Sequence, residues 1–202
     1  MENDIICSRA PGATHRLILL HGWGADAEDL MSLGEELIKG GIEQKLELLA
    51  FNAPHRHPGG VGRQWYGLFP PDWVSVPSAI NDLQVRIKAL SKNSIALEKT
   101  VILGFSQGGA MALSAGSELP LAGLIGCSSY PHPNWVPSET SPPILLLHGM
   151  QDEIVPIEAS RQILSSLKKK KLDVDFLEFE GGHEISQETL PRIQLALNNW
   201  LV

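Results

Sequence analysis

The sequence predicts an α/β protein with a doubly wound, mainly parallel sheet, in which helices cover both faces to form a three-layer αβα sandwich. Short, continuous apolar runs alternate along the chain with segments whose apolar residues recur at helical spacing. Continuous apolar runs are typical of parallel strands that are buried on both faces. Polar residues directly follow several of these runs, and sites in such sheets lie beyond the carboxyl ends of the strands.

Length and composition favour one globular domain, residues 1–202. The chain has 202 residues, of which 43% are hydrophobic and 19% charged, and this is enough to bury a sizeable core. The net charge of −7 argues against nucleic acid as a partner and against electrostatic docking on anionic lipid. The basic run Lys168–Lys171 ends a predicted helix, so we interpret it as a solvated face that complements the helix dipole.

Targeting and redox features indicate a cytoplasmic protein. The N-terminus lacks the basic and apolar regions of a signal peptide, and no apolar run is long enough to span a membrane. Two cysteines, Cys7 and Cys127, do not make a disulfide scaffold, and both lie in apolar runs. We therefore expect both thiols to be reduced and buried.

The predicted elements follow one another with short connections. The strands expected in chain order are 5–7, as a short edge strand, then 17–20, 46–51, 100–105, 121–127, 144–147 and 174–179. Asp26 is expected to cap the first helix, which ends at Gly40-Gly41, and Ser78 to cap the second. A third helix follows residue 106, Pro156 opens a fourth, and the last carries Leu190, Ile193, Leu197 and Leu201.

Residues 55–77 are expected to form a long irregular segment. It is rich in proline and glycine, yet it carries four of the twelve aromatic residues of the chain. Loops of this length in compact domains are usually functional or disordered, and the aromatic content argues against disorder.

The motif Gly104-x-Ser106-x-Gly108 lies between an apolar strand and a small-residue helix. This strand–turn–helix context gives the G-x-S-x-G elbow its meaning, because small neighbours let a strained turn close around the serine. The turn holds the serine oxygen clear of the sheet, above a helix N-terminus that favours negative charge. Ser106 is thus a candidate nucleophile.

A nucleophilic serine needs a general base and an acid that orients the base. Where this elbow supplies the nucleophile, the chain order is Ser, then Asp or Glu, then His. Asp152 directly follows a strand and lies in a turn, and His183 is the only histidine after it. The order excludes the other six histidines, which are His15, His21, His55, His57, His132 and His148.

Other acids compete with Asp152. Glu153 is its neighbour and can substitute for it, whereas Asp173 and Asp175 lie at the opposite end of a strand. His21, at a strand end before a glycine, is interpreted as structural, with hydrogen bonds to nearby backbone.

Acyl transfer also requires donors for an oxyanion. One donor is expected to be the backbone N–H of the residue after the nucleophile, Gln107. The second is expected from the loop after the strand 17–20, and within His21-Gly22-Trp23-Gly24 we choose the N–H of Trp23.

Four segments together resemble the carboxylesterase/acyl-protein thioesterase family of α/β-hydrolases, also called the phospholipase/carboxylesterase family. They are LLHGWGADAEDL, GFSQGGAMAL, ILLLHGMQDEIVP and FEGGHEIS, in the order of the family and spread between residues 17 and 186. The resemblance implies an α/β-hydrolase fold and a Ser106–Asp152–His183 triad. It also implies an oxyanion hole from the Trp23 and Gln107 amides.

The same resemblance implies hydrolysis of small-molecule acyl esters or thioesters without a cofactor or metal. The chain departs from the family pattern at Trp23, where leucine is common, and at Ala25, where aspartate is common. The group that matters at residue 23 is backbone, so we expect the oxyanion hole to survive and the bulkier indole to narrow the acyl site.

The substrate pocket is expected to be walled by loops. Residues 131–142 leave no room for the large helical lid that many α/β-hydrolases insert there. The aromatic residues proposed as walls, and hence as substrate-binding, are Trp65, Tyr66, Phe69, Trp73 and Trp135.

Two other readings stay open at the level of sequence. The first is a non-catalytic ligand-binding protein on a hydrolase scaffold, because fold alone does not prove activity. The second is a peptidase or a dienelactone-type hydrolase, although the latter usually carries cysteine at position 106. The acyl group, the preference for ester or thioester, and the oligomeric state are not written in the sequence.

Overall fold

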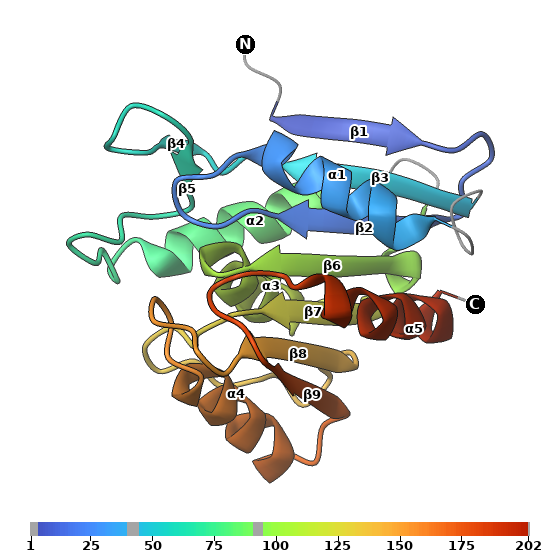
Figure 1. The fold of residues 1–202 in the computed structure, drawn as a ribbon. Coiled ribbons are helices and arrows are strands. Elements are labelled where there is room, and N and C mark those ends of the chain that lie inside the picture. The colour runs from blue at the N-terminus through green and yellow to red at the C-terminus, as the bar shows by residue number, and fades with distance from the viewer. Residues whose placement is uncertain (1–3, 40–44, 91–94, 202) are drawn as a thin grey trace.

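A computed structural model describes residues 4–39, 45–90 and 95–201. Its main feature is a seven-stranded sheet with the order β1-β3-β2-β6-β7-β8-β9 (Figure 1). Neighbouring strands run parallel except at the edge, where β1 pairs antiparallel with β3. The sheet confirms the predicted α/β class.

The strands match the apolar runs, with small differences at their ends. Their bounds are β1 Ile5–Arg9, β2 His15–Leu20, β3 Leu46–Phe51, β6 Thr100–Phe105, β7 Gly123–Cys127, β8 Ile144–Gly149 and β9 Val174–Phe179. Every residue of β2, β3 and β8 is buried, as expected of strands that are covered on both faces.

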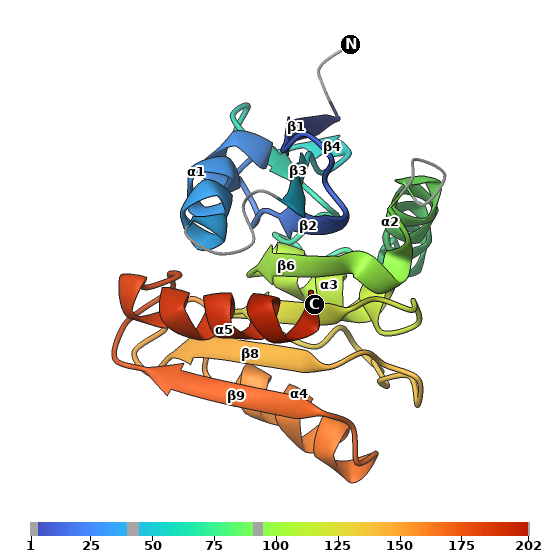
Figure 2. The ribbon, with the colours of Figure 1, turned by 90° about the vertical axis from the view of Figure 1, so that its right-hand side faces the viewer.

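Helices cover the two faces separately (Figure 2). One face carries α1 Ala27–Ile38 and α5 Leu190–Trp200, and the other carries α2 Val76–Leu90, α3 Gln107–Gly116 and α4 Glu158–Lys169. Short 3₁₀ helices span Leu97–Lys99 and Gln187–Thr189. Within the part of the chain described, none of the helices has both the length and the apolar character needed to cross a lipid bilayer.

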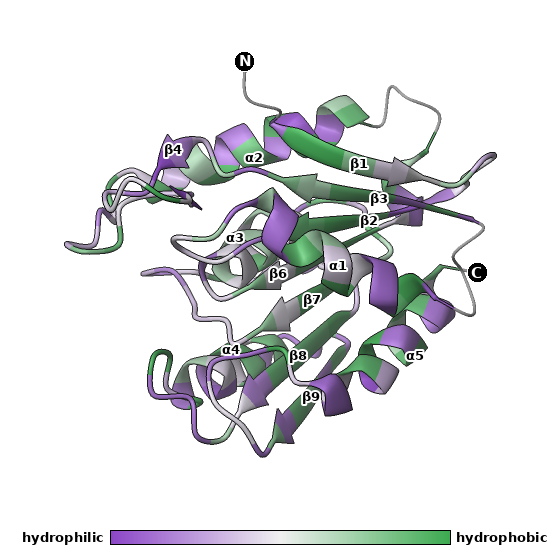
Figure 3. Cartoon of the chain, turned by 45° about the horizontal axis from the view of Figure 1, so that its top comes forward, coloured by the Kyte–Doolittle hydropathy of each residue, from purple (hydrophilic) through white to green (hydrophobic). Residues whose placement is uncertain are grey.

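The core consists of two layers separated by the sheet. Along β2, Ile18 and Leu20 pack toward α2 and α3, whereas Leu17 and Leu19 pack toward α1 and α5. Figure 3 shows the corresponding pattern of green strands and mixed purple and green helices. The alternation of the β2 side chains between the two layers follows from the two-residue period of a strand.

A buried ion pair joins the neighbouring strands β2 and β3. Arg16 Nε donates to Glu47 Oε2 at 2.5 Å, and the exposed fractions of the two side chains are 1% and 8%. The guanidinium also donates to the carbonyl oxygens of Leu90 and Ile95. These contacts tie the amino ends of the central strands to the connection after α2.

Asp26 is the N-cap of α1, as predicted, and accepts a hydrogen bond from the Glu28 amide. The predicted end of this helix, Gly40-Gly41, lies outside the described residues. The prediction that Ser78 caps α2 was wrong, because that helix begins at Val76. Ser75 precedes it, with its carbonyl oxygen accepting from the Ala79 amide, and burial of Val76 favours the earlier start.

Two further expectations were wrong. Residues 55–77 are not wholly irregular, since β4 His55–Arg56 and β5 Arg63–Gln64 form a small antiparallel hairpin. Cys7 is exposed, because β1 is an edge strand, whereas Cys127 at the end of central β7 is buried. Neither Cys7 nor Cys127 forms a disulfide, which agrees with the expectation that both thiols are reduced.

Candidate active site

The elbow brings Ser106 to the carboxyl edge of the sheet, between β6 and α3. Its backbone angles are φ 53° and ψ −117°, a region that side-chain-bearing residues rarely adopt. A Cβ at Gly104 would lie 2.2 Å from the Gly108 carbonyl oxygen, and a Cβ at Gly108 would lie 2.1 Å from the Leu20 carbonyl oxygen. The two glycines of the motif are therefore required by close backbone contacts.

The predicted acid and base meet at the same edge. Asp152 follows β8 and His183 follows β9, and His183 Nδ1 lies 2.8 Å from Asp152 Oδ2. The His183 ring centroid is 4.8 Å from that of Phe105, the residue before Ser106. The imidazole thus lies beside the elbow, with one ring nitrogen bonded to the carboxylate.

The carboxylate of Asp152 is buried and held in a turn. Its Oδ1 accepts hydrogen bonds from the amides of Ile154 at 3.0 Å and Val155 at 2.8 Å. Burial by itself raises the pKa of Asp152, but the hydrogen bonds from His183 and the two amides outweigh burial and lower the pKa below its usual value. Glu153, the competing acid, is exposed.

The loop after β2 lies against the elbow. A Cβ at Gly22 would lie 3.5 Å from the Ser106 Cβ, so the backbone before Trp23 is next to the serine. Among the described residues, the amides of Trp23 and Gln107 have no protein acceptor. The Trp23 indole turns toward the hairpin, where its Nε1 donates to Gln64 Oε1 at 2.9 Å.

His21 has the structural role predicted for it. Its Nδ1 lies 2.7 Å from the Gly22 carbonyl oxygen, and its Nε2 accepts from the Ala53 amide at 3.0 Å. Burial lowers the pKa of His21, which favours the neutral imidazole. In this form one ring nitrogen donates and the other accepts, and the two hydrogen bonds join the ends of β2 and β3.

The side chain of Gln107 has a role that sequence reasoning missed. Its Oε1 accepts from the Trp65 amide at 3.1 Å, and its Nε2 donates to the Tyr66 carbonyl oxygen at 2.9 Å. It is fully buried. The side-chain amide of Gln107 therefore holds the base of the aromatic segment, residues 65–73, against the start of α3 next to Ser106.

The proposed aromatic walls occupy different environments. Trp65 and Tyr66 are each 1% exposed and belong to the core, so their side chains pack beneath the loop and anchor it to the protein interior. Phe69 is 72% exposed and contacts the Trp23 ring edge-on at 5.2 Å. Trp73 and Trp135 line a cavity of about 610 Å³ between α2, α3 and the loop 132–135.

A chain of hydrogen bonds begins at Ser114 and His132, which line that cavity, and leads away from it to two tyrosines. Ser114 Oγ lies 2.7 Å from His132 Nδ1, and His132 Nε2 lies 2.8 Å from the Tyr66 hydroxyl. The Tyr66 hydroxyl in turn lies 2.7 Å from that of Tyr130. Burial lowers the pKa of His132 to about 4, so this histidine is a neutral structural group at pH 7.

The fold and the geometry of this edge define an α/β-hydrolase. Residues 1–201 match the family model described as Phospholipase/Carboxylesterase, and the chain belongs to that family. A curated relative, acyl-protein thioesterase 1 of Yarrowia lipolytica, is 27% identical over 216 residues, covering 93% of this chain and 91% of the relative.

Solved structures agree with this assignment. The crystal structure of esterase PE8 is 29% identical, with a TM-score of 0.86 and coverage of 97% of this chain and 98% of that chain. The crystal structure of Arabidopsis thaliana SOBER1 is 26% identical, with a TM-score of 0.80 and coverage of 93% and 99%. The family consists of esterases and thioesterases, which is the class of chemistry that the sequence motifs predicted.

Proposed function

We propose that this protein is a serine hydrolase that cleaves carboxylic esters through an acyl-enzyme on Ser106. His183 acts as general base and then general acid, and Asp152 orients it. The backbone N–H groups of Trp23 and Gln107 stabilise the oxyanion. The alcohol leaves after the first step, and water releases the acid in the second.

Each step uses a group near the elbow. His183 takes the Ser106 proton through Nε2, because its Nδ1 is already bonded to Asp152. The new bond joins Ser106 Oγ to the acyl carbon, and the same proton is delivered to the departing alkoxide. In deacylation His183 removes a proton from water, and the released proton returns to Ser106.

The 2.8 Å contact between His183 and Asp152, beside the strained Ser106, is the observation that carries this proposal. A ligand-binding protein on the same scaffold has no need of an oriented imidazole next to a strained serine. The buried carboxylate and its lowered pKa are consistent with an acid that stays ionised while it orients the base.

A fluorophosphonate probe tests the assignment directly. Mass spectrometry is expected to locate the adduct on Ser106, and the Ser106→Ala variant should lose both labelling and turnover of p-nitrophenyl acetate. Ser78→Ala, which changes an exposed serine on α2, is the matched control and should retain both. A folded wild-type protein without an adduct would instead support a non-catalytic binding function.

A second candidate is an acyl-protein thioesterase or lysophospholipase rather than a small-ester carboxylesterase. It is favoured by curated relatives named acyl-protein thioesterase 1 that match 93% of this chain. Comparing kcat/KM for matched p-nitrophenyl esters and acyl thioesters of two to sixteen carbons separates the two. Preference for short oxygen esters supports the first candidate, and preference for long thioesters supports the second.

A further inference from the structure

The carboxylate of Asp152 is surrounded by four hydrogen-bond donors, and two of them are imidazoles. The amides of Ile154 and Val155 donate to Oδ1. His183 Nδ1 lies 2.8 Å from Oδ2, and His148 Nε2 lies 3.2 Å from the same oxygen. The chain order excludes His148 as the base, yet this histidine contacts the same carboxylate oxygen as His183.

The contacts of His148 determine its tautomer. Its Nε2 lies 2.8 Å from the Val155 carbonyl oxygen, which can only accept, so Nε2 carries the proton and shares it with Asp152 Oδ2. Its Nδ1 lies 2.7 Å from Ser160 Oγ, whose hydroxyl donates to the neutral ring. Burial lowers the pKa of His148, which favours this neutral form.

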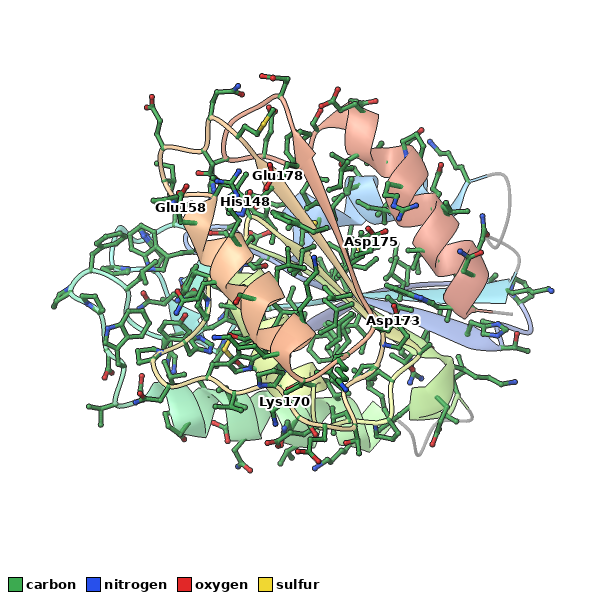
Figure 4. The ribbon with its side chains drawn as sticks, turned by 90° about the horizontal axis from the view of Figure 1, so that it is seen from below. His148, Glu158, Lys170, Asp173, Asp175 and Glu178 are labelled. Atoms are coloured by element: carbon green, nitrogen blue, oxygen red, sulfur yellow. The ribbon has the colours of Figure 1, made fainter. Side chains whose placement is uncertain are left out.

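His148 and Ser160 form a rigid support because neither is accessible to solvent. Both residues have exposed fractions of 0%. His148 lies in β8 and Ser160 in α4, so the support connects the sheet to its covering helix (Figure 4). Ser160 Oγ also lies 3.2 Å from the carbonyl oxygen of Ser129, just after β7, but its single hydroxyl proton serves the shorter contact with His148.

We propose that His148, oriented by Ser160, is a positioning residue whose Nε2–H holds Asp152 Oδ2 in place for His183. This inference rests on the proposed function, because it assigns a role within the same proton relay. A carboxylate fixed by donors on both oxygens cannot rotate away from the base, and fixed partners of this kind are what keep a catalytic ring in the productive orientation.

The contact between His148 Nε2 and Asp152 Oδ2 also affects how much negative charge faces the His183 ring. Without the His148 donor, Oδ2 keeps more charge for His183 and favours the protonated, inactive base. The other charged groups of this region are more exposed to solvent: Glu178 of β9 pairs with Arg161 of α4, which also contacts Glu158. Glu178 is opposite His148 in the strand pairing, and both are labelled in Figure 4.

Three variants and one control test the role. His148→Leu is expected to reduce kcat/KM about tenfold and to move the acid limb of its pH profile upward by about 0.5 to 1 unit. His148→Gln retains a donor that can reach Asp152 and should restore most of the activity and the wild-type limb. Ser160→Ala should move the limb in the same direction by a smaller amount, whereas Ser166→Ala, which removes a hydroxyl bonded, among the described residues, only to the Gln162 carbonyl oxygen within α4, should not move it.

The readouts separate this inference from the proposed function. A fluorophosphonate adduct on wild-type Ser106 tests the function alone. If the adduct forms and both His148→Leu and Ser160→Ala keep the wild-type acid limb, the positioning role is wrong. Ring ¹⁵N shifts of the wild-type protein provide a measurement that needs no variant: a neutral His148 protonated on Nε2 supports the proposal, and protonation on Nδ1 overturns it.

Discussion

The buried His132 predicts a specific pH dependence of stability. Burial lowers its folded-state pKa to about 4, whereas an unfolded histidine has a pKa of about 6.5. Between these values the unfolded chain binds a proton that the folded chain does not, so stability falls as the pH falls. The contribution of the neutral His132 to the free energy of unfolding is fully present above pH ~6.5. It then decreases by about 1.4 kcal/mol for each pH unit of acidification, and the total loss reaches about 3 kcal/mol near pH ~4.

Urea unfolding of the wild type and His132→Gln at several pH values from 4.5 to 7.5 measures this term. Glutamine can contact Ser114 and Tyr66 but does not titrate, so its free energy of unfolding should depend less steeply on pH. The difference between the two slopes is expected to approach about 1.4 kcal/mol per pH unit below pH ~6. His21 and His148, whose pKa values are also lowered by burial, contribute equally to both proteins and cancel.

Ser114→Ala is the matched control for this experiment. It removes the hydroxyl that lies 2.7 Å from His132 Nδ1 but leaves the imidazole buried. Because burial is the cause of the lowered pKa, this variant should lose stability at every pH while keeping the wild-type slope. Parallel curves for the wild type and His132→Gln would refute the reasoning.

Three other predictions address the elbow and its surroundings. Trp23→Ala should keep substantial kcat because it retains the backbone N–H, whereas Trp23→Pro should lose about 2.7–4 kcal/mol of transition-state stabilisation in kcat/KM. Gly108→Ala should lower the free energy of unfolding by about 1–3 kcal/mol in urea titrations, because its Cβ would lie 2.1 Å from the Leu20 carbonyl oxygen. Gly182→Ala, whose Cβ would meet nothing closer than 3.9 Å, is the control and should unfold like the wild type. Trp135→Ala should reduce kcat/KM for esters with long acyl chains and leave kcat/KM for acetate esters unchanged. The reason is that the cavity lined by Trp135 is also lined by Ser114, which lies about 12 Å along α3 from Ser106, within reach of a long chain only. Equal losses at all chain lengths would contradict this role.

The arrangement of the candidate site was predictable because parallel strands end at one edge of the sheet. Ser106, Asp152 and His183 each follow a strand, and β6, β8 and β9 run in the same direction. Strand direction and chain order therefore determined which acid and which histidine meet, without any knowledge of side-chain positions. The apolar runs predicted the strands for the same reason, since burial on both faces leaves little room for polar residues.

Contacts that depend on packing between distant segments were not predictable. Only the backbone amide of Gln107 was assigned a role from the sequence, yet its side chain accepts from the Trp65 amide and donates to the Tyr66 carbonyl oxygen. Cys7 looked buried because its neighbours are apolar, and its exposure follows from the place of β1 at the edge of the sheet. The edge position of the first strand was predicted, but which side chains are exposed on it and which pair across the fold is not contained in the local pattern of residues.

The contacts around the elbow separate the parts of the site that are fixed from the parts that can vary. Ser106 is held by backbone contacts through Gly104 and Gly108, and Asp152 by donors on both of its oxygens. A side chain at either glycine would collide with backbone atoms, and loss of the Asp152 carboxylate would leave its amide donors without an acceptor, so these positions leave little freedom to change.

The aromatic segment is different, because only its base is fixed. Gln107 and the core packing of Trp65 anchor it, and beyond them Phe69 is 72% exposed and Trp73 is 38% exposed. Substitutions at these two tips need not disturb the strand ends that carry Ser106 and His183. Substrate preference can therefore change at the tips while the proposed acyl-transfer chemistry stays constant, which is why chain-length profiles of tip variants are the informative measurement for this protein.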